Sequence, residues 1–270
     1  MIKNWIKKIF HAVGLDIIRY SKATEKKPTI DTKVEELTEG FKNDIEVVRA
    51  YSMLSQGRLQ SLYECVHYCE ATNLQGDYVE CGVWKGGAVG LMALANKRFG
   101  KTPRHLHLFD TFEGIPEPDE AIDGARAVRE ARQFGAETKG RMVANPQLYE
   151  NMGRGVGTLE LNKELIEGEI GYSPDYLHYH VGFFQDTVPE QASQIKEISI
   201  LRLDGDWYAS TKVCLDYLYD KVASGGFIII DDYGAYEGCQ KAVDEFFAKQ
   251  PHRTPFMFRV DEELRLMVKP

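Results

Sequence analysis

The stretch Val79-Glu80-Cys81-Gly82-Val83-Trp84-Lys85-Gly86-Gly87 contains the local signals that decide the fold. Its apolar start predicts a β-strand, its glycines predict a tight turn, and the apolar residues from Ala88 onward predict a helix. A second predicted strand, Leu106–Asp110, follows the helix and ends in an acidic residue. This order forms a βαβ unit with parallel strands, which is typical of folds that bind a nucleoside-type cofactor at the carboxyl ends of the strands.

The same alternation continues to the C-terminus and predicts an α/β fold with a seven-stranded, mainly parallel sheet. The loop Asp261-Glu262-Glu263 between the last two strands is too short for a helix, so these strands form a hairpin and the last strand is antiparallel. The predicted strands are residues 78–81, 106–110, 177–181, 198–204, 226–231, 256–260 and 264–268. The predicted helices lie near residues 44–54, 59–69, 88–98, 188–195, 210–218 and 238–249.

The predicted domain organisation is an N-terminal helix and linker over residues 1–35, followed by one domain over residues 36–270. Residues 2–20 have an apolar face flanked by lysines, which fits either a membrane-surface or partner-binding helix, or one that packs on its own domain or on a second subunit. Residues 111–171 form an insertion too long for a simple loop. We interpret it as a lid over the site, with a peripheral helical decoration as the alternative.

The composition excludes several classes of function. The 270-residue chain has a net charge of −8, which argues against nucleic acid as a partner. Its five cysteines lack Cys-x-x-Cys spacing and are expected to be reduced. There is no apolar run long enough to span a membrane and no cleavable signal peptide. We therefore expect a cytoplasmic protein, with a possible peripheral contact at the inner face of the membrane through residues 2–20.

The glycine turn discriminates between cofactors. Gly82 and Gly87 fit the outer positions of a dinucleotide fingerprint, but Trp84 occupies the middle position, where an indole would obstruct a pyrophosphate. A cofactor without phosphates, such as S-adenosylmethionine, is compatible with this turn. Glu80 is then placed near the methionine ammonium group, and Asp110 is placed to accept hydrogen bonds from the ribose hydroxyls.

Two acidic strand ends predict a metal site. Asp204 and Asp206 follow one apolar strand, and Asp231 and Asp232 follow Phe227-Ile228-Ile229-Ile230, which reads as a central strand. These aspartates could simply cap the following helices. Because no Lys or Arg lies among the four to neutralise them, however, they would repel one another strongly unless a cation such as Mg²⁺ bound between them.

Other patterns give weaker or negative signals. The pairs His105/His107 and His178/His180 have the spacing of zinc ligands on strands, but both lie before the strand ends, so we interpret them as ordinary sheet residues. The sequence has no Gly-x-Ser-x-Gly elbow and no His-Glu-x-x-His helix, so nucleophilic hydrolysis and zinc proteolysis lack support.

Six ordered blocks of the sequence between Tyr51 and Phe247 resemble the macrocin O-methyltransferase family, which includes sugar methyltransferases of macrolide and aminocoumarin antibiotic pathways. The blocks are Met53-Leu54-Ser55-Gln56-Gly57-Arg58-Leu59, the glycine turn quoted above, Phe109-Asp110-Thr111-Phe112-Glu113-Gly114, Gly182-Phe183-Phe184-Gln185-Asp186-Thr187, Leu203-Asp204-Gly205-Asp206-Trp207-Tyr208-Ala209-Ser210-Thr211 and Gly225-Gly226-Phe227-Ile228-Ile229-Ile230-Asp231-Asp232-Tyr233.

The resemblance implies a Rossmann-like class I methyltransferase that uses S-adenosylmethionine and Mg²⁺ (or Mn²⁺) to methylate a sugar hydroxyl. It implies Asp204, Asp231 and Asp232 as metal ligands and Asp206 as the catalytic base. The cofactor-binding residues that it implies are Met53, Glu80, Gly82, Asp110, Thr111 and Asp186.

The acceptor stays open at this point. A glycoside and a cell-surface polysaccharide are both compatible with the sequence, and a phenolic or catechol-like small molecule is an alternative acceptor. A Mg²⁺-dependent phosphoryl or nucleotide hydrolase could use the same aspartates, but Trp84 makes the glycine turn a poor phosphate cradle. We expect a small-molecule or glycan substrate, no nucleic-acid partner and a homo-oligomer.

Overall fold

The computed structural model describes residues 30–250 and 254–270. Contacts divide the chain into residues 1–36 and residues 37–270, and the account below concerns the second unit. The amphipathic helix expected over residues 2–20 lies outside the described residues.

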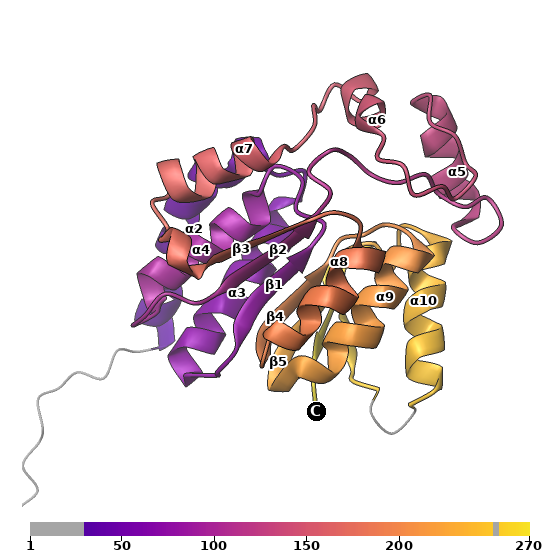
Figure 1. The fold of residues 1–270 in the computed structure, drawn as a ribbon. Helices are drawn as coiled ribbons and strands as arrows, with labels where there is room; N and C mark the ends of the chain where they lie inside the picture. Colours follow the sequence, from indigo (N-terminus) through magenta and orange to yellow (C-terminus); the bar gives the residue numbers. More distant parts are fainter. Residues whose placement is uncertain (1–29, 251–253) are drawn as a thin grey trace, which may run out of the picture. The chain divides into compact units, whose positions relative to one another are not determined.

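The second unit is built on a seven-stranded sheet with the order β3-β2-β1-β4-β5-β7-β6 (Figure 1). Strands β1 to β5 pair in parallel, whereas β7 is antiparallel to both β5 and β6, so the expected hairpin and the antiparallel last strand are confirmed. The strands are β1 (Asp77–Cys81), β2 (Leu106–Asp110), β3 (Leu177–Val181), β4 (Ile198–Leu203), β5 (Val222–Ile230), β6 (Met257–Arg259) and β7 (Arg265–Val268).

Helices cover both faces of this sheet (Figure 1). One apolar cluster joins α3 (Gln56–Thr72) and α4 (Gly87–Phe99) to one face, and a second joins α8 (Phe184–Gln191), α9 (Tyr208–Leu218) and α10 (Glu237–Ala248) to the other. The remaining helices are α2 (Ile30–Val48), α5 (Gly124–Gln133), α6 (Pro146–Asn151) and α7 (Leu159–Lys163). Of these, α5, α6 and α7 belong to the insertion over residues 111–171.

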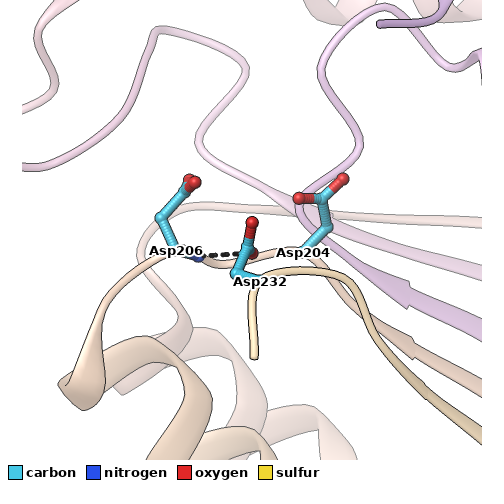
Figure 2. Close-up of side chains that lie close together, drawn as sticks. All are labelled: Asp204, Asp206 and Asp232. Atoms are coloured by element: carbon cyan, nitrogen blue, oxygen red, sulfur yellow. Dashed lines mark hydrogen bonds between the residues drawn. The ribbon is translucent and has the colours of Figure 1, made fainter. Parts of the chain in front are cut away.

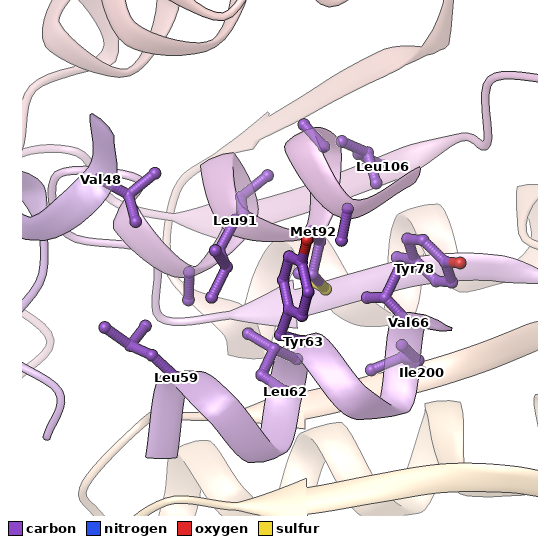
Figure 3. Close-up of a cluster of buried hydrophobic side chains, with 14 of the residues drawn as sticks. Val48, Leu59, Leu62, Tyr63, Val66, Tyr78, Leu91, Met92, Leu106 and Ile200 are labelled. Atoms are coloured by element: carbon purple, nitrogen blue, oxygen red, sulfur yellow. The ribbon is translucent and has the colours of Figure 1, made fainter. Parts of the chain in front are cut away.

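The alternation of side chains along the strands produces the two apolar layers. In β2, Leu106 and Leu108 contribute to the first cluster, whereas Phe109 contributes to the second. Figure 3 shows side chains of α3 and α4 meeting those of the sheet in the first cluster. Burial of a large apolar side chain contributes about 1.5–3 kcal/mol to stability, so this packing fixes the sheet edge from which the functional loops leave.

Two helix predictions were wrong in their boundaries. The helix expected near residues 44–54 is α2, which ends at Val48 because Phe41, Ile45 and Val48 are its buried face and the chain becomes extended at Ser52. The helix expected near residues 188–195 is α8, which begins at Phe184 and contains Pro189 in its interior. Phe184 packs against the second apolar cluster, so tertiary packing decided this boundary.

Four histidines lie side by side on β2, β3 and the residue preceding β2. His107 Nδ1 lies 3.1 Å from His180 Nε2, and His107 Nε2 lies 3.2 Å from Asp77 Oδ2. Burial, and then the neighbouring His107, lowers the pKa of His178 and lowers that of His180 to about 4. In the unfolded chain a histidine pKa is about 6.5.

Because these pKa values are lower in the folded protein than in the unfolded chain, acid reduces the stability of the fold. A histidine whose pKa is lowered by folding contributes stability that is fully present above pH ~6.5 and is lost as the pH falls towards ~4. For His180 the free energy of unfolding falls by at most ~2 kcal/mol at pH ~5, and by about 1 kcal/mol once solvent screening is included. Urea unfolding at pH ~7.5 and ~5 should therefore show a smaller loss of stability for His180→Gln than for the wild type. Identical losses would contradict this assignment.

Candidate active site at the carboxyl edge of the sheet

Three aspartates meet at the carboxyl ends of the two central strands (Figure 2). Asp204 directly follows β4, Asp206 lies two residues further on, and Asp232 follows β5. One carboxylate oxygen from each residue lies within 4.8 Å of the others. Carboxylate oxygens are the hard ligands that Mg²⁺ and Mn²⁺ prefer, so the chemistry and the spacing of this donor set fit a divalent cation.

The backbone conformation that brings Asp206 into this cluster was not predicted from the sequence. The sequence predicted a strand as far as Asp204, but β4 ends at Leu203, and Asp206 has a positive φ of 57°. Such a conformation is unfavourable for a residue other than glycine. The Asp206 N–H donates to Asp232 Oδ2 at 3.0 Å, which fixes this turn and directs the Asp206 side chain to the same side as its neighbours (Figure 2).

The expectation that no arginine neutralises these aspartates was wrong. Arg202 of β4 is completely buried and donates to Glu80, to Asp204 at 2.9 Å and to Asp231 at 2.8 Å. Arg58 of α3 donates to the other Asp231 oxygen at 2.7 Å. Asp231 therefore lies beside the three-carboxylate cluster, with both of its oxygens held by arginines, and Asp206 takes the third place in the cluster.

The protonation behaviour of the cluster follows from this arrangement. Burial, followed by repulsion from Asp204 and Asp231, raises the pKa of Asp206 well above its ordinary range. Burial and repulsion from Asp206 and Asp204 do the same to the pKa of Asp232. The pKa of Asp231 rises only to about 6, because the two arginines oppose burial and the repulsion from Asp204. Full ionisation of the cluster thus requires compensating positive charge.

A cavity of about 510 Å³ extends from the cluster along the glycine turn. Its lining includes Gly82, Asp110, Thr111, Phe184 and Asp204. The cavity is open to solvent and joins the aspartates to the strand-to-helix turn, which is where α/β folds bind cofactors.

Asp110 lines this cavity and is held by backbone groups of the two loops beside it. Its carboxylate accepts hydrogen bonds from the backbone N–H groups of Val83 at 2.7 Å, Trp84 at 3.1 Å and Phe112 at 2.8 Å. Asp110 thus anchors the glycine turn and the loop after β2. Trp84, within this turn, has a positive φ of 48°, which the hydrogen bond to Asp110 helps to hold.

Of the other residues implied as cofactor ligands, some line a cavity and some do not. Glu80 is buried beside Arg202, its pKa is raised to about 8 mainly by burial, and its Oε2 has no hydrogen-bond partner among the described residues. Asp186 is exposed and does not line the cavity, whereas Phe183, Phe184 and Gln185 do. Met53 lines a second cavity.

This second cavity adjoins the first, is open to solvent and encloses about 750 Å³ of space. It shares Gly82, Trp84, Asp110, Asp204 and Asp206 with the first cavity, among other residues. Its remaining walls come largely from the insertion and from aromatic side chains, namely Glu130, Ala131, Phe134, Leu148, Tyr149, Met152, Trp207 and Tyr236. The two cavities therefore share two aspartates of the acidic cluster.

Comparison with known proteins assigns the chain to a family. The family model described as Macrocin-O-methyltransferase (TylF) matches residues 10–154 and 162–264. The chain belongs to this family. The predicted resemblance is confirmed, and the protein is an O-methyltransferase.

Two curated relatives and two solved structures define the relationship of this macrocin-O-methyltransferase family member to other proteins. It is 34% identical over 203 residues to demethyldecarbamoylnovobiocin O-methyltransferase of Streptomyces niveus, covering 74% of this chain and 69% of that protein. It is 34% identical over 197 residues to 8-demethyl-8-(2,3-dimethoxy-alpha-L-rhamnosyl)-tetracenomycin-C 4'-O-methyltransferase of Streptomyces olivaceus, covering 73% of this chain and 67% of that protein.

The O-methyltransferase NovP superposes with a TM-score of 0.69 at 25% identity, over 87% of this chain and 98% of NovP. The calicheamicin methyltransferase CalS11 gives a TM-score of 0.56 at 16% identity, over 94% of this chain and 98% of CalS11. The class I methyltransferase fold is thereby confirmed for this family member. No helix among residues 30–250 and 254–270 is both long and apolar enough to cross a membrane.

Several site residues of this family member were not predicted from the sequence. Arg202 could have been found, because it is the one charged residue in the apolar strand Ile198-Ser199-Ile200-Leu201-Arg202-Leu203. Tyr149 and Tyr236 had no comparable signal, since each is a single aromatic residue in a loop or short helix that only the tertiary structure brings to the cavity.

Proposed function

We propose that this protein transfers a methyl group from S-adenosylmethionine to a sugar hydroxyl of a glycoside or polysaccharide, with Mg²⁺ or Mn²⁺ bound at the acidic cluster. The observation that carries the proposal is that two aspartates of the cluster, Asp204 and Asp206, line both of two adjoining cavities. The printed name of the S. olivaceus relative supports a sugar, since it includes a rhamnosyl group.

For the metal, we propose Asp204, Asp231 and Asp232 as ligands. Asp204 and Asp232 belong to the three-carboxylate cluster. Asp231 can still bind the ion, because each carboxylate oxygen has two lone pairs. The hydrogen bonds from Arg58 and Arg202 occupy only one lone pair on each oxygen. These arginines then orient Asp231 in the way that outer hydrogen bonds orient metal ligands.

For the chemistry, we propose Asp206 as the base that accepts the proton of the acceptor hydroxyl. Its carboxylate belongs to the cluster and lines both cavities, so it can reach a hydroxyl that enters from the second cavity. S-adenosylmethionine supplies the methyl group, and a bound divalent ion lowers the pKa of the coordinated hydroxyl. The walls of the two cavities hold donor and acceptor in line, and such positioning can contribute ~7–11 kcal/mol to catalysis.

For the cofactor, we propose that it occupies the first cavity, against Gly82 and Thr111. Asp110, which lines this cavity and anchors the glycine turn, accepts hydrogen bonds from the ribose hydroxyls in this proposal. Glu80, near the end of β1, has a free Oε2 for the methionine ammonium group. Met53 lines the second cavity, and we propose it as a neighbour of the methionine end of the cofactor. Asp186 lies in the first turn of α8, next to Gln185, which lines the first cavity.

Removal of the metal is expected to abolish the reaction. Chelation should lower turnover by at least ~100-fold, because the hydroxyl then loses its activating charge, and added Mg²⁺ or Mn²⁺ should restore it. Calorimetric titration with Mn²⁺ should show that Asp232→Asn binds the ion at least ~10-fold more weakly than the wild type. The control Asp216→Asn, in an exposed ion pair on α9, should bind normally. Full activity after chelation would contradict the proposed metal dependence.

The acceptor class is tested by mass spectrometry. The protein is incubated with S-adenosylmethionine, Mg²⁺ and separate panels of glycosides, polysaccharides and catechols, and the products are examined for one added methyl group. Methylation of a sugar hydroxyl is the expected result. Methylation of the catechols alone would overturn the sugar assignment and favour the phenolic alternative, because catechols also present two adjacent oxygens to a metal.

A further inference from the structure

Glu263, in the turn between β6 and β7, joins two arginines from distant parts of the chain. Its Oε2 accepts from Arg58 Nη2 of α3 at 2.5 Å, and its Oε1 accepts from Arg126 Nη1 of α5 at 2.7 Å. Arg58 also holds Asp231 at the acidic edge. A single carboxylate thus connects the edge that carries the proposed metal site to a helix of the insertion.

From Arg126 the contacts lead directly to the second cavity. Arg126 Nε donates to Glu130 Oε1 at 2.8 Å, and its guanidinium lies over the ring of Tyr236, 5.3 Å from the ring centre. The Tyr236 hydroxyl donates to the other Glu130 oxygen at 2.8 Å. Glu130 and Tyr236 both line the second cavity, as do Ala131 of α5 and Phe134, which directly follows this helix.

The turn that carries Glu263 is itself well fixed. Asp261 Oδ1 accepts from the backbone N–H groups of Glu263 at 2.9 Å and Leu264 at 2.8 Å. The Glu263 carbonyl accepts from the N–H of Gly234, in the loop after β5, at 2.8 Å. Glu263 is therefore a rigid support against which α5 can be held.

We propose that Glu263 is a positioning residue, which fixes α5 through Arg126 so that Glu130, Ala131 and Phe134 form the wall of the acceptor cavity. This inference rests on the proposed function, because it identifies the second cavity as the acceptor site. Glu263 touches neither cavity, so its effect on the reaction passes through Arg126 and α5.

The expected kinetic result is selective for the acceptor. Glu263→Gln should raise the acceptor KM about 5- to 10-fold, because the wall of the cavity is no longer held, and change kcat by less than about 3-fold. The affinity for S-adenosylhomocysteine, measured by calorimetry, should stay unchanged, because none of the residues in this network lines the first cavity.

A double-mutant cycle separates this role from general stabilisation. Arg126→Gln should raise the acceptor KM at least as much, because Arg126 also holds Glu130, and the double variant should be no worse than Arg126→Gln, because the effect of Glu263 passes through Arg126. The matched control is Arg132→Gln on the same helix, whose ion pair with Glu120 is exposed, and it should leave KM unchanged. An unchanged KM in Glu263→Gln, or additive effects in the double variant, would overturn the proposal.

Hydrogen exchange gives a second readout that does not depend on the reaction. The amides of residues 124–133 should exchange faster in Glu263→Gln than in the wild type, whereas those of β1 and β4 should not change. If no sugar were methylated but α5 still exchanged faster, the proposed function would fail while the contact between Glu263 and α5 would stand. Unchanged exchange in α5 would overturn the positioning role itself.

Discussion

Replacement of Asp206 by Asn is expected to reduce kcat by about 10²- to 10⁴-fold, which is the usual contribution of a positioned general base. Asn has the shape of Asp but cannot accept the proton of a hydroxyl at neutral pH. It also tolerates the positive φ of 57° at this position, and the backbone N–H that donates to Asp232 is retained. The variant should therefore fold normally and lose chemistry alone.

The measurement combines turnover with two binding titrations. Asp206→Asn should bind S-adenosylhomocysteine and Mn²⁺ with the affinities of the wild type, whereas Asp231→Asn should lose metal affinity as well as turnover. This comparison decides between two roles, because Asp206 and not Asp231 belongs to the cluster of three carboxylates. A loss of Mn²⁺ affinity in Asp206→Asn that matches its loss of turnover would reassign Asp206 as a metal ligand.

Replacement of Arg202 by Met is expected to reduce the free energy of unfolding by about 3–5 kcal/mol at neutral pH. Arg202 is fully buried, and it is the partner of Glu80, Asp204 and Asp231. Without it, carboxylates that are themselves buried lose their compensating charge. The deficit should shrink as the pH falls from ~7.5 to ~5, because protonation of Asp231, whose pKa is about 6, then removes uncompensated charge.

Urea unfolding at pH ~7.5 and ~5 tests both parts of this expectation. The control Arg259→Met removes an exposed arginine whose contact with Glu262 measures 4.0 Å, and it should change stability by less than about 0.5 kcal/mol. Arg202→Met should also bind Mn²⁺ less tightly, since Asp204 and Asp231 lose the group that orients them. A free energy of unfolding within about 1 kcal/mol of the wild type at both pH values would contradict this expectation, because other groups would then compensate the charge of the carboxylates.

The elements predicted best were those with a strong local pattern. The strands Leu106–Asp110 and Leu177–Val181 have the predicted boundaries, because apolar runs between turn residues define them locally. The helix boundaries near Val48 and Phe184 were wrong, since contacts with the core decide where these helices begin and end. The acidic strand ends were found, but their partners Arg202 and Arg58 were not.

By itself, the sequence determined the βαβ order, the antiparallel last strand, the family and the presence of aspartates at one edge of the sheet. These features follow from short-range patterns and from the rule that the carboxyl ends of parallel strands share an edge. Only the tertiary structure decided which carboxylates converge, which are held by arginines, and that the insertion lines a cavity. Such features depend on contacts between residues far apart in the chain, such as Arg58 and Asp231, and local spacing does not encode them.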